Sequence, residues 1–312
     1  MAFSPLNWVN NAAAFGKLIR IVPLAAWGGG AVLLGTAAVL PQLRAPFSWT
    51  GPFAALLAVL LLQGIAAHSL NDVADWQSGT DRSTAGILSG GSGVLKKNLF
   101  TARQLLLFFR YSLFLSLALT CYLCYQHHSL SLFLFLLIGL WAAVAYTCNP
   151  LRLAYRPLLG EWLAAWPAMV ACTAGTSFLL AGSIPVISWW AGIIHATISV
   201  AWLMQHHLPD IAADLTARPV KNTTVAYLCA HLGWRYVTLP SGLYFFLVLV
   251  FGLAALSWHR GFALSMLTGL AGMLLALATD PRSIADITRK QMVMMLLSSL
   301  HFCLLSASFI YY

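Results

Sequence analysis

Residues 52–70 read PFAALLAVLLLQGIAAHSL, and residues 71–82, which follow directly, read NDVADWQSGTDR. The first stretch has the length and apolar character of a transmembrane helix, which needs about 20 such residues. The second stretch places Asp72, Asp75 and Asp81 immediately after that helix. Together they predict a membrane-spanning helix that ends in a cluster of carboxylates at one face of the bilayer.

The composition extends this prediction to the whole chain. Of its 312 residues, 60% are hydrophobic and 8% are charged, whereas soluble domains carry about 25% charged residues. So few charges cannot cover a water-soluble protein of this size, and most of the surface must face lipid. The long apolar runs favour helices over the short strands of a barrel. We therefore predict an all-α membrane protein that forms a single domain over residues 1–312.

About nine apolar runs are long enough to cross the bilayer. They lie near residues 21–40, 52–70, 104–125, 130–148, 161–181, 186–206, 236–257, 262–279 and 291–311. The segment 222–234 has two interpretations, a short additional helix or the start of the seventh span.

The charged residues indicate how these spans are oriented. All but two of the 17 Lys and Arg residues fall on or near the side that holds the N-terminus, the exceptions being Arg44 and Arg260. Cytoplasmic loops carry an excess of Lys and Arg, so this side is predicted to be cytoplasmic. This placement accounts for the net charge of +9, and we do not expect nucleic-acid binding.

All eight acidic residues fall on the same predicted side. They are Asp72, Asp75, Asp81, Glu161, Asp210, Asp214, Asp280 and Asp286. The rule for Lys and Arg does not account for acids, so a chemical site at this membrane face is the simplest explanation.

The first acidic cluster contains ligands that Mg²⁺ prefers. If the helix continues, Asp72 and Asp75 share one face at i, i+3, and Gly79 lets the chain turn to bring Asp81 back. Asn71 adds an amide oxygen. Mg²⁺ takes one or two carboxylates and completes its shell with water and substrate phosphate, and no His or Cys cluster favours zinc.

The second cluster is formed by Asp210 and Asp214, which share a helix face at i, i+4. Two acidic pairs that face each other across a cavity would repel, and Mg²⁺ between them would create a receptor for a diphosphate. A solvated polar loop is the alternative interpretation of either pair alone. Two pairs at one face of a chain with eight acids favour the metal site.

Basic residues accompany both clusters, namely Arg82, Arg152, Arg156, Arg218 and Lys221. Guanidinium and ammonium groups can neutralise diphosphate oxygens. Anchoring at the cytoplasmic face is the alternative for each of them. We favour Lys221 and Arg156 as diphosphate ligands, with Arg82 and Arg152 as further candidates.

A glycine-rich stretch, GILSGGSGVL at residues 86–95, follows the first cluster. It lacks the G-K-[ST] ending of a phosphate-binding P-loop. We therefore expect a flexible loop that caps the cavity.

These motifs resemble those of the UbiA superfamily of intramembrane prenyltransferases. The first hallmark is N-D-x-x-D with a further Asp, here Asn71, Asp72, Asp75 and Asp81. The second is D-x-x-x-D with a downstream Lys, here Asp210, Asp214 and Lys221. The third is the stretch 146–156, from Tyr146 to Arg156, closed by Gly160 and Glu161. The gap before Asp81 is similar to that of the MenA branch, which prenylates dihydroxynaphthoate.

The resemblance implies nine transmembrane helices around a central cavity, with both Asp motifs at its cytoplasmic end. It implies that an allylic prenyl diphosphate is ionised with Mg²⁺ and that its cation alkylates an acceptor, usually an aromatic ring. By position, the metal ligands would be Asn71, Asp72, Asp75, Asp210 and Asp214, with Asp81 as a ligand or a support for the ligands. The diphosphate ligands would be Lys221 and Arg156, with Tyr146 as a further candidate.

The chain departs from the family pattern at three histidines. His68 stands where the family commonly has Asn, and His206 and His207 stand where it often has an Asn pair. An imidazole can act as a base near neutral pH, whereas an amide cannot. His68 and His207 are therefore catalytic candidates that would deprotonate an acceptor or a cyclising cation. The alternative is that they only form hydrogen bonds within the site.

Three functions are compatible with these residues. The first is a prenyltransferase with an aromatic, quinone-precursor-like acceptor, and the second is a terpene cyclase on the same scaffold that uses no external acceptor. A transporter is the third, since intramembrane carboxylates also mark ion pathways. The acids lie at one face of the membrane and not near its midplane, which disfavours the transporter.

Overall fold

A computed structural model of the chain describes residues 5–43, 46–83 and 89–311. Within these residues, eight helical segments are long and apolar enough to cross a membrane, and Leu132–Ala145 is a shorter apolar helix. The eight are Ile21–Gln42, Thr50–Ser78, Ala102–His127, Glu161–Ala181, Val186–Thr216, Trp234–Ala255, Arg260–Leu277 and Ile284–Tyr311. These eight correspond to eight of the nine apolar runs of the sequence, and Leu132–Ala145 corresponds to the fourth run, near residues 130–148. The all-α membrane fold is confirmed.

The helical elements are named in chain order, with η for short 3₁₀ or π segments. The first half contains α1 (Pro5–Ile19), α2 (Ile21–Leu24), η1 (Ala25–Gly29), α3 (Gly30–Val39), η2 (Leu40–Gln42), α4 (Thr50–Val59), η3 (Leu60–Ala67), α5 (His68–Ser78), α6 (Thr80–Ser83), α7 (Ala102–His127) and α8 (Leu132–Ala145). The second half contains η4 (Leu153–Tyr155), η5 (Glu161–Ala165), α9 (Trp166–Ala181), α10 (Val186–His206), η6 (Leu208–Asp210), α11 (Ile211–Thr216), α12 (Thr224–Leu232), η7 (Trp234–Tyr236), α13 (Leu239–Ala255), η8 (Arg260–Phe262), α14 (Ala263–Leu277) and α15 (Ile284–Tyr311).

The outer surface of the bundle is apolar. Phe114, Leu134, Leu267 and Leu296 expose 58–66% of their surface. Large contiguous apolar surfaces are rare on soluble monomers. Together with the length of the helices, this exposure identifies the outer faces as lipid-facing.

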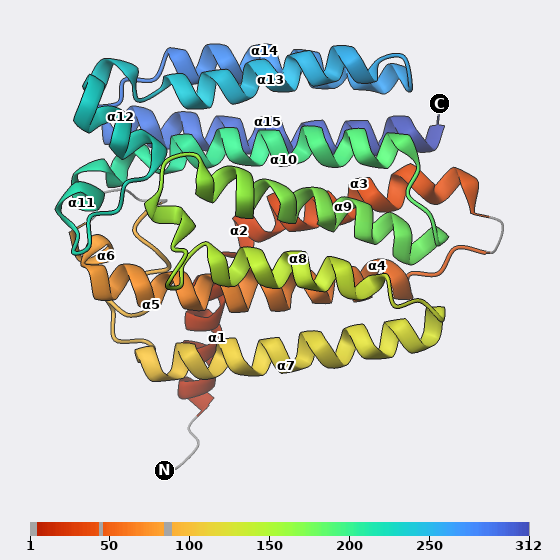
Figure 1. Cartoon of the computed structure of the whole chain (residues 1–312), viewed down its shortest axis with the longest axis horizontal. Coiled ribbons are helices and arrows are strands. Elements are labelled where there is room, and N and C mark those ends of the chain that lie inside the picture. Colours follow the sequence, from red (N-terminus) through yellow and green to blue (C-terminus); the bar gives the residue numbers. More distant parts are fainter. Residues whose placement is uncertain (1–4, 44–45, 84–88, 312) are drawn as a thin grey trace.

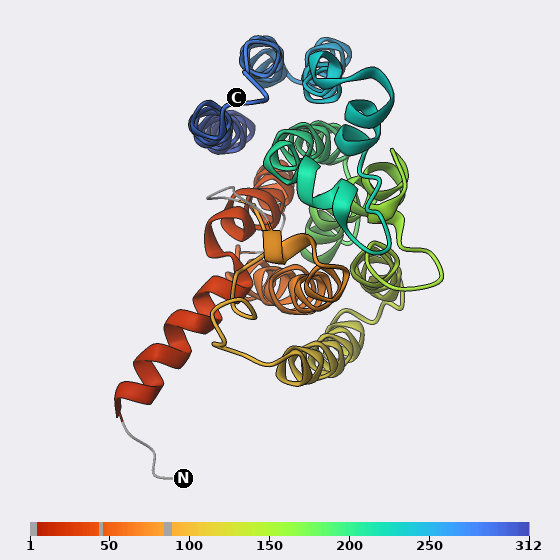
Figure 2. The ribbon, with the colours of Figure 1, turned by 90° about the vertical axis from the view of Figure 1, so that its left-hand side faces the viewer.

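The long helices run side by side, and the short polar elements gather at one end of the bundle (Figure 1). α5, α6, α11 and α12 lie at that end, whereas the C-terminus lies at the other. Figure 2 shows this end face-on, with α1 leaning away from the bundle. A buried apolar core joins α3, α10, α13 and α15.

Two spans continue beyond the ends that hydropathy predicts. The second reaches Ser78 and the sixth reaches Thr216, whereas the apolar runs end near residues 70 and 206. The extensions carry the two Asp motifs, so the acids begin on the helices and not in open loops. Segment 222–234 contains a separate short helix, α12, before the seventh span begins at Trp234.

Candidate active site

The helices enclose a cavity of about 400 Å³ whose walls come from η1, η3, α8, α9 and α10, among other elements. Polar residues line one end of it, namely Asn71, Asp75, Asp81, Asp210 and Lys221. We call this the carboxylate end. The rest of the lining includes apolar residues of α4, α7, α8 and α9, namely Ala54, Leu123, Leu132, Phe135 and Leu179. An apolar chamber with one charged end suits an amphiphile that has an anionic head and a hydrocarbon tail.

The first motif is held on α5 with its acids buried. Asp72 and Asp75 expose 2% and 4% of their surface. Asn71 Nδ2 donates to Asp75 Oδ2 at 2.9 Å, and Arg20 Nη2 donates to Asp72 Oδ1 at 2.5 Å. These hydrogen bonds hold the two carboxylates in place. The positive charge of Arg20 also offsets the repulsion between the two buried negative charges, which would otherwise be unfavourable.

Gly79 ends α5 with a φ of 93°, and the chain then turns back into α6, which carries Asp81. Asp81 is 7% exposed and lines the cavity. Burial, together with the charges of Asp75 and Asp72, raises the pKa of Asp81 to about 7. A cation at this position would lower that pKa and hold the carboxylate in its charged form.

The glycine-rich stretch covers the first motif. Ser92 donates to Asp72 through both its backbone N–H and its hydroxyl, and Gly90 and Gly91 line the cavity. A Cβ on Gly91 would lie 2.1 Å from Asp81 Oδ2. Residues 89–95 therefore pack as the expected cap, whereas 86–88 lie outside the described residues.

The cap yields a testable prediction at Gly91. Gly91 and Gly93 have similar φ values of 69° and 70°, but a Cβ on Gly93 would meet no atom within 4 Å. Gly91→Ala and Gly93→Ala should each incur a backbone strain of about 1–2 kcal/mol, seen as comparable losses of thermal stability. Only Gly91→Ala should also displace Asp81, and we expect at least tenfold slower release of diphosphate from the allylic prenyl diphosphate that the sequence motifs imply. Equal rates in the two variants would contradict the cap's contact with Asp81.

The second motif occupies η6 and α11, where Asp210 is 7% exposed and Asp214 is 1% exposed. Thr223 Oγ1 donates to Asp214 Oδ2 at 3.1 Å. The Oδ1 atoms of both carboxylates are buried without a hydrogen-bond partner. Such oxygens are costly to leave unsatisfied, so they indicate where a cation would bind.

Backbone and ionic contacts join the two motifs. Arg218 N–H donates to the carbonyl oxygen of Ser78 at 2.9 Å, so the segment after α11 is tied to the end of α5. Lys221 Nζ lies 2.7 Å from Asp75 Oδ2. Burial opposes the charge of Lys221, but Asp75 and Asp214 outweigh it and hold the pKa of the ammonium well above its usual value. Lys221 is thus a permanent cation between the motifs.

Only some of the predicted basic ligands reach the cavity. Lys221 and Tyr146 line it. Arg82 packs on the Trp76 ring at 4.9 Å, and Arg152 packs on the Tyr155 ring at 5.2 Å. These two and Arg156, which is exposed, are not among the lining residues. Their role as diphosphate ligands stays a prediction.

Arg20 is a cavity residue that the sequence did not indicate. It lines the carboxylate end and hydrogen-bonds Asp72 and Asn71. In the sequence it is one of many basic residues beside a span. Only the packing of the α1–α2 junction against α5 reveals its position.

The donor set fits Mg²⁺. Among the described residues, no three His, Cys, Asp or Glu side chains converge on one point. Mg²⁺ does not require this, because it takes one or two carboxylates and keeps water and phosphate as its other ligands. The available donors are hard oxygens, and those of Asp210 and Asp214 include atoms without partners.

The three histidines that depart from the family pattern all line the cavity. The Nδ1 atoms of His68, His206 and His207 are buried without partners. The His206 ring stacks on Trp202 with centroids 4.8 Å apart, and Trp202 contacts Trp27 at 5.4 Å. Imidazoles with a free nitrogen therefore lie beside an aromatic wall near the carboxylate end.

Comparison with known proteins agrees with this geometry. Residues 31–300 match the UbiA prenyltransferase family. The chain belongs to this family. Comparison with curated protein sequences gives no match.

Two solved structures of a UbiA homolog from Archaeoglobus fulgidus resemble this UbiA-family chain. One, bound to GPP and Mg²⁺, has a TM-score of 0.63 at 15% identity over 94% of this chain and 99% of that one. The other, bound to DMAPP and Mg²⁺, has a TM-score of 0.60 at 12% identity over 93% and 99%. They show the same fold. None of these matches singles out the dihydroxynaphthoate branch.

Proposed function

We propose that the chain is a Mg²⁺-dependent intramembrane prenyltransferase that ionises an allylic prenyl diphosphate and transfers the prenyl group to an aromatic acceptor. The observation that carries this proposal is the carboxylate end itself. Asp75 and Asp81 of the first motif, Asp210 of the second and the buried Lys221 line one end of a mostly apolar cavity. Asp72 and Asp214 are buried beside them but are not among the lining residues. The Mg²⁺ and prenyl diphosphates bound to the Archaeoglobus fulgidus homolog support it.

Six residues would hold Mg²⁺, namely Asn71, Asp72, Asp75, Asp81, Asp210 and Asp214. Mg²⁺ held there would supply positive charge to the diphosphate oxygens and so make the diphosphate a better leaving group. Lys221 and Arg20 contribute fixed positive charge at the same place. Tyr146 offers a phenol at the edge of the cavity.

The reaction breaks the bond between the allylic carbon and the diphosphate oxygen, and the electron pair leaves with the diphosphate. The apolar walls exclude water, so the cation is not quenched by hydrolysis. An acceptor carbon then attacks the allylic carbon, and the ring loses a proton. His68 or His207 would accept it, since each has an Nδ1 atom without a partner.

The first acceptor to test is dihydroxynaphthoate, because the spacing of Asp72, Asp75 and Asp81 is similar to that of the MenA branch. A terpene cyclase is the second candidate. The unpaired imidazoles of His206 and His207 favour it, because they could deprotonate a cyclised cation. Membranes given Mg²⁺ and a prenyl diphosphate without acceptor would then release a cyclic hydrocarbon or alcohol, which would exclude the transferase.

The proposed orientation places the carboxylate end and the N-terminus on the cytoplasmic side. It is supported by the excess of Lys and Arg on that side. The prenyl diphosphate would then enter from the cytoplasmic face of the bilayer.

Removal of the metal tests the proposal directly. Purified protein in EDTA should release at least a hundredfold less diphosphate from geranyl diphosphate than in Mg²⁺, because the buried carboxylates alone repel the substrate. Added Mg²⁺ should restore the rate. An EDTA-treated sample that keeps its full rate would refute the metal-dependent mechanism.

A further inference from the structure

A second, smaller cavity adjoins the cavity described above, which we call the main cavity. It has a volume of about 220 Å³, against about 400 Å³ for the main cavity. Its lining residues are His127, Ser129, Leu132, Phe178, Leu179 and Gly182. Leu132 and Leu179 also line the main cavity, so the same two side chains face both spaces. The proposed function gives the second cavity no role so far.

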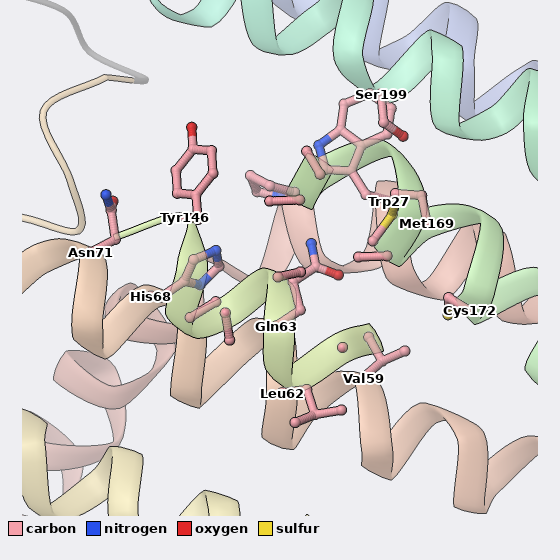
Figure 3. Close-up of a pocket in the computed structure, with 18 of the residues that line it drawn as sticks. Trp27, Val59, Leu62, Gln63, His68, Asn71, Tyr146, Met169, Cys172 and Ser199 are labelled. Atoms are coloured by element: carbon pink, nitrogen blue, oxygen red, sulfur yellow. The ribbon is translucent and has the colours of Figure 1, made fainter. Parts of the chain in front are cut away.

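The main cavity follows the second span for most of its length. Ala54 and Asp75 both line it, and both belong to the span Thr50–Ser78. They are 21 residues apart in the sequence, which corresponds to about 30 Å along a helix. Figure 3 shows the middle of this wall, where the lining residues are, in order from the carboxylate end, Asn71, His68, Gln63, Leu62 and Val59. On this span, Ala54 is the lining residue farthest from the carboxylates.

Leu132 and Leu179 close this far end. They are buried in one apolar cluster with Cys124, and Ala54 packs against that cluster. Leu132 begins α8 and exposes 7% of its surface, whereas Leu179 lies in the last turn of α9 and exposes 5%. Because each leucine lines both cavities, one layer of side chains separates the two spaces. We call this pair of leucines the partition.

The second cavity begins directly behind the partition. Gly182 ends α9 with a φ of 68°, and a Cβ there would meet no atom within 4 Å. Phe178 of the second cavity packs against Phe135 of the main cavity, with ring centroids 5.9 Å apart. A leucine side chain forms no hydrogen bonds, so the partition depends on the volume of its two side chains.

The partition limits the tail of an amphiphile whose head is held at the carboxylate end. The tail of a prenyl diphosphate would lie along the apolar walls and bury more apolar surface with each additional isoprene unit. That gain ends at the leucines, because a longer tail would have to displace packed side chains, which is unfavourable. The length of the main cavity therefore corresponds to a maximum length of the tail.

We propose that Leu132 and Leu179 set the upper limit on the length of the prenyl chain that the protein accepts. This inference rests on the proposed prenyltransferase function and specifies its donor. Truncation of either leucine to alanine would open the partition and add the second cavity, of about 220 Å³, to the space available to the tail. Such variants should bind long donors better relative to short ones.

The test compares the affinities of the full-length protein, in detergent with Mg²⁺, for geranyl, farnesyl and geranylgeranyl diphosphate. Thermal stabilisation relative to the same protein without donor reports each affinity and requires no acceptor. Leu179→Ala should raise the affinity for geranylgeranyl diphosphate relative to geranyl diphosphate at least tenfold above the wild-type ratio. Leu132→Ala should raise this ratio as well and provides a second, independent measure. The donors enter the detergent equally with every variant, so that effect cancels in the comparison.

Two control variants keep the partition closed. Leu179→Met conserves the volume of the side chain. Leu305→Ala makes the same truncation at a fully buried leucine of α15 that is not among the residues lining either cavity. Both controls should keep the wild-type ratio.

The partition would be refuted if Leu179→Ala and Leu132→Ala kept the wild-type ratio, or if Leu305→Ala raised it equally. Donor consumption with dihydroxynaphthoate is measured in parallel. Wild type that neither binds nor consumes any of the three donors would overturn the proposed function. Wild type that binds them, with a ratio that is unchanged in both alanine variants, would overturn the partition alone.

Discussion

Asn in place of Asp210 should slow Mg²⁺-dependent consumption of geranyl diphosphate by about a thousandfold, because a neutral amide cannot replace a carboxylate at a cation. The same change should leave the apo protein at least as stable as wild type. Asp210 Oδ1 is buried without a hydrogen-bond partner, and a neutral amide is less costly to bury than a carboxylate. Loss of activity together with unchanged or higher thermal stability would show that Asp210 is a metal ligand and not a structural residue.

The control for this experiment is Asp280→Asn. Asp280 belongs to the same predicted membrane face, but it is exposed and accepts a hydrogen bond from the backbone of Arg282. This variant should retain wild-type consumption of geranyl diphosphate. If both variants lost activity equally, the effect would come from the charge of the membrane face and not from the site.

Replacement of Lys221 by Met should affect both stability and activity. Lys221 and Asp75 are buried and lie 2.7 Å apart, and removal of one partner from a buried ion pair costs about 3–5 kcal/mol. In the absence of Mg²⁺, the melting temperature of Lys221→Met should therefore fall well below that of wild type. Diphosphate release should also slow by about a hundredfold or more, because a positive charge at the leaving group is lost.

Magnesium should partly rescue the stability of Lys221→Met. A divalent cation between Asp75 and the second motif would compensate the same carboxylates that Lys221 neutralises. The Mg²⁺-induced rise in melting temperature should thus be larger in the variant than in wild type. Lys97→Met is the control, because Lys97 is exposed and should show the wild-type response. An Mg²⁺ effect that is equal in all three proteins would contradict a shared carboxylate site.

The contrast between Lys221 and Arg156 shows that the sequence does not predict which basic side chains reach the cavity. The sequence favours both as diphosphate ligands, because both lie beside motifs of the family. Lys221 is buried against Asp75 and lines the cavity, whereas Arg156 is exposed and does not. Sequence spacing places a residue near a span end but does not determine the direction of its side chain. That direction follows from packing with residues far away along the chain.

The membrane fold, the spans and the two carboxylate pairs follow from the sequence by itself. Hydropathy is a local property of about 20 residues, and i, i+3 or i, i+4 spacing within one helix brings acids to one face. Neither depends on the rest of the chain. The runs near 52–70 and 186–206 and the acids that follow them can therefore be predicted without a structure.

Only the tertiary structure determined how the carboxylates are compensated and what lines the cavity. Arg20 contacts Asp72, which is 52 residues away in the sequence, and Lys221 contacts Asp75, which is 146 residues away. The π segment η3, from which Leu62, Gln63 and Ala67 line the cavity, is likewise not visible in the hydropathy, since it depends on small changes of helix geometry among packed helices. Such contacts depend on how helices from distant parts of the chain are packed together, and no local pattern encodes that packing.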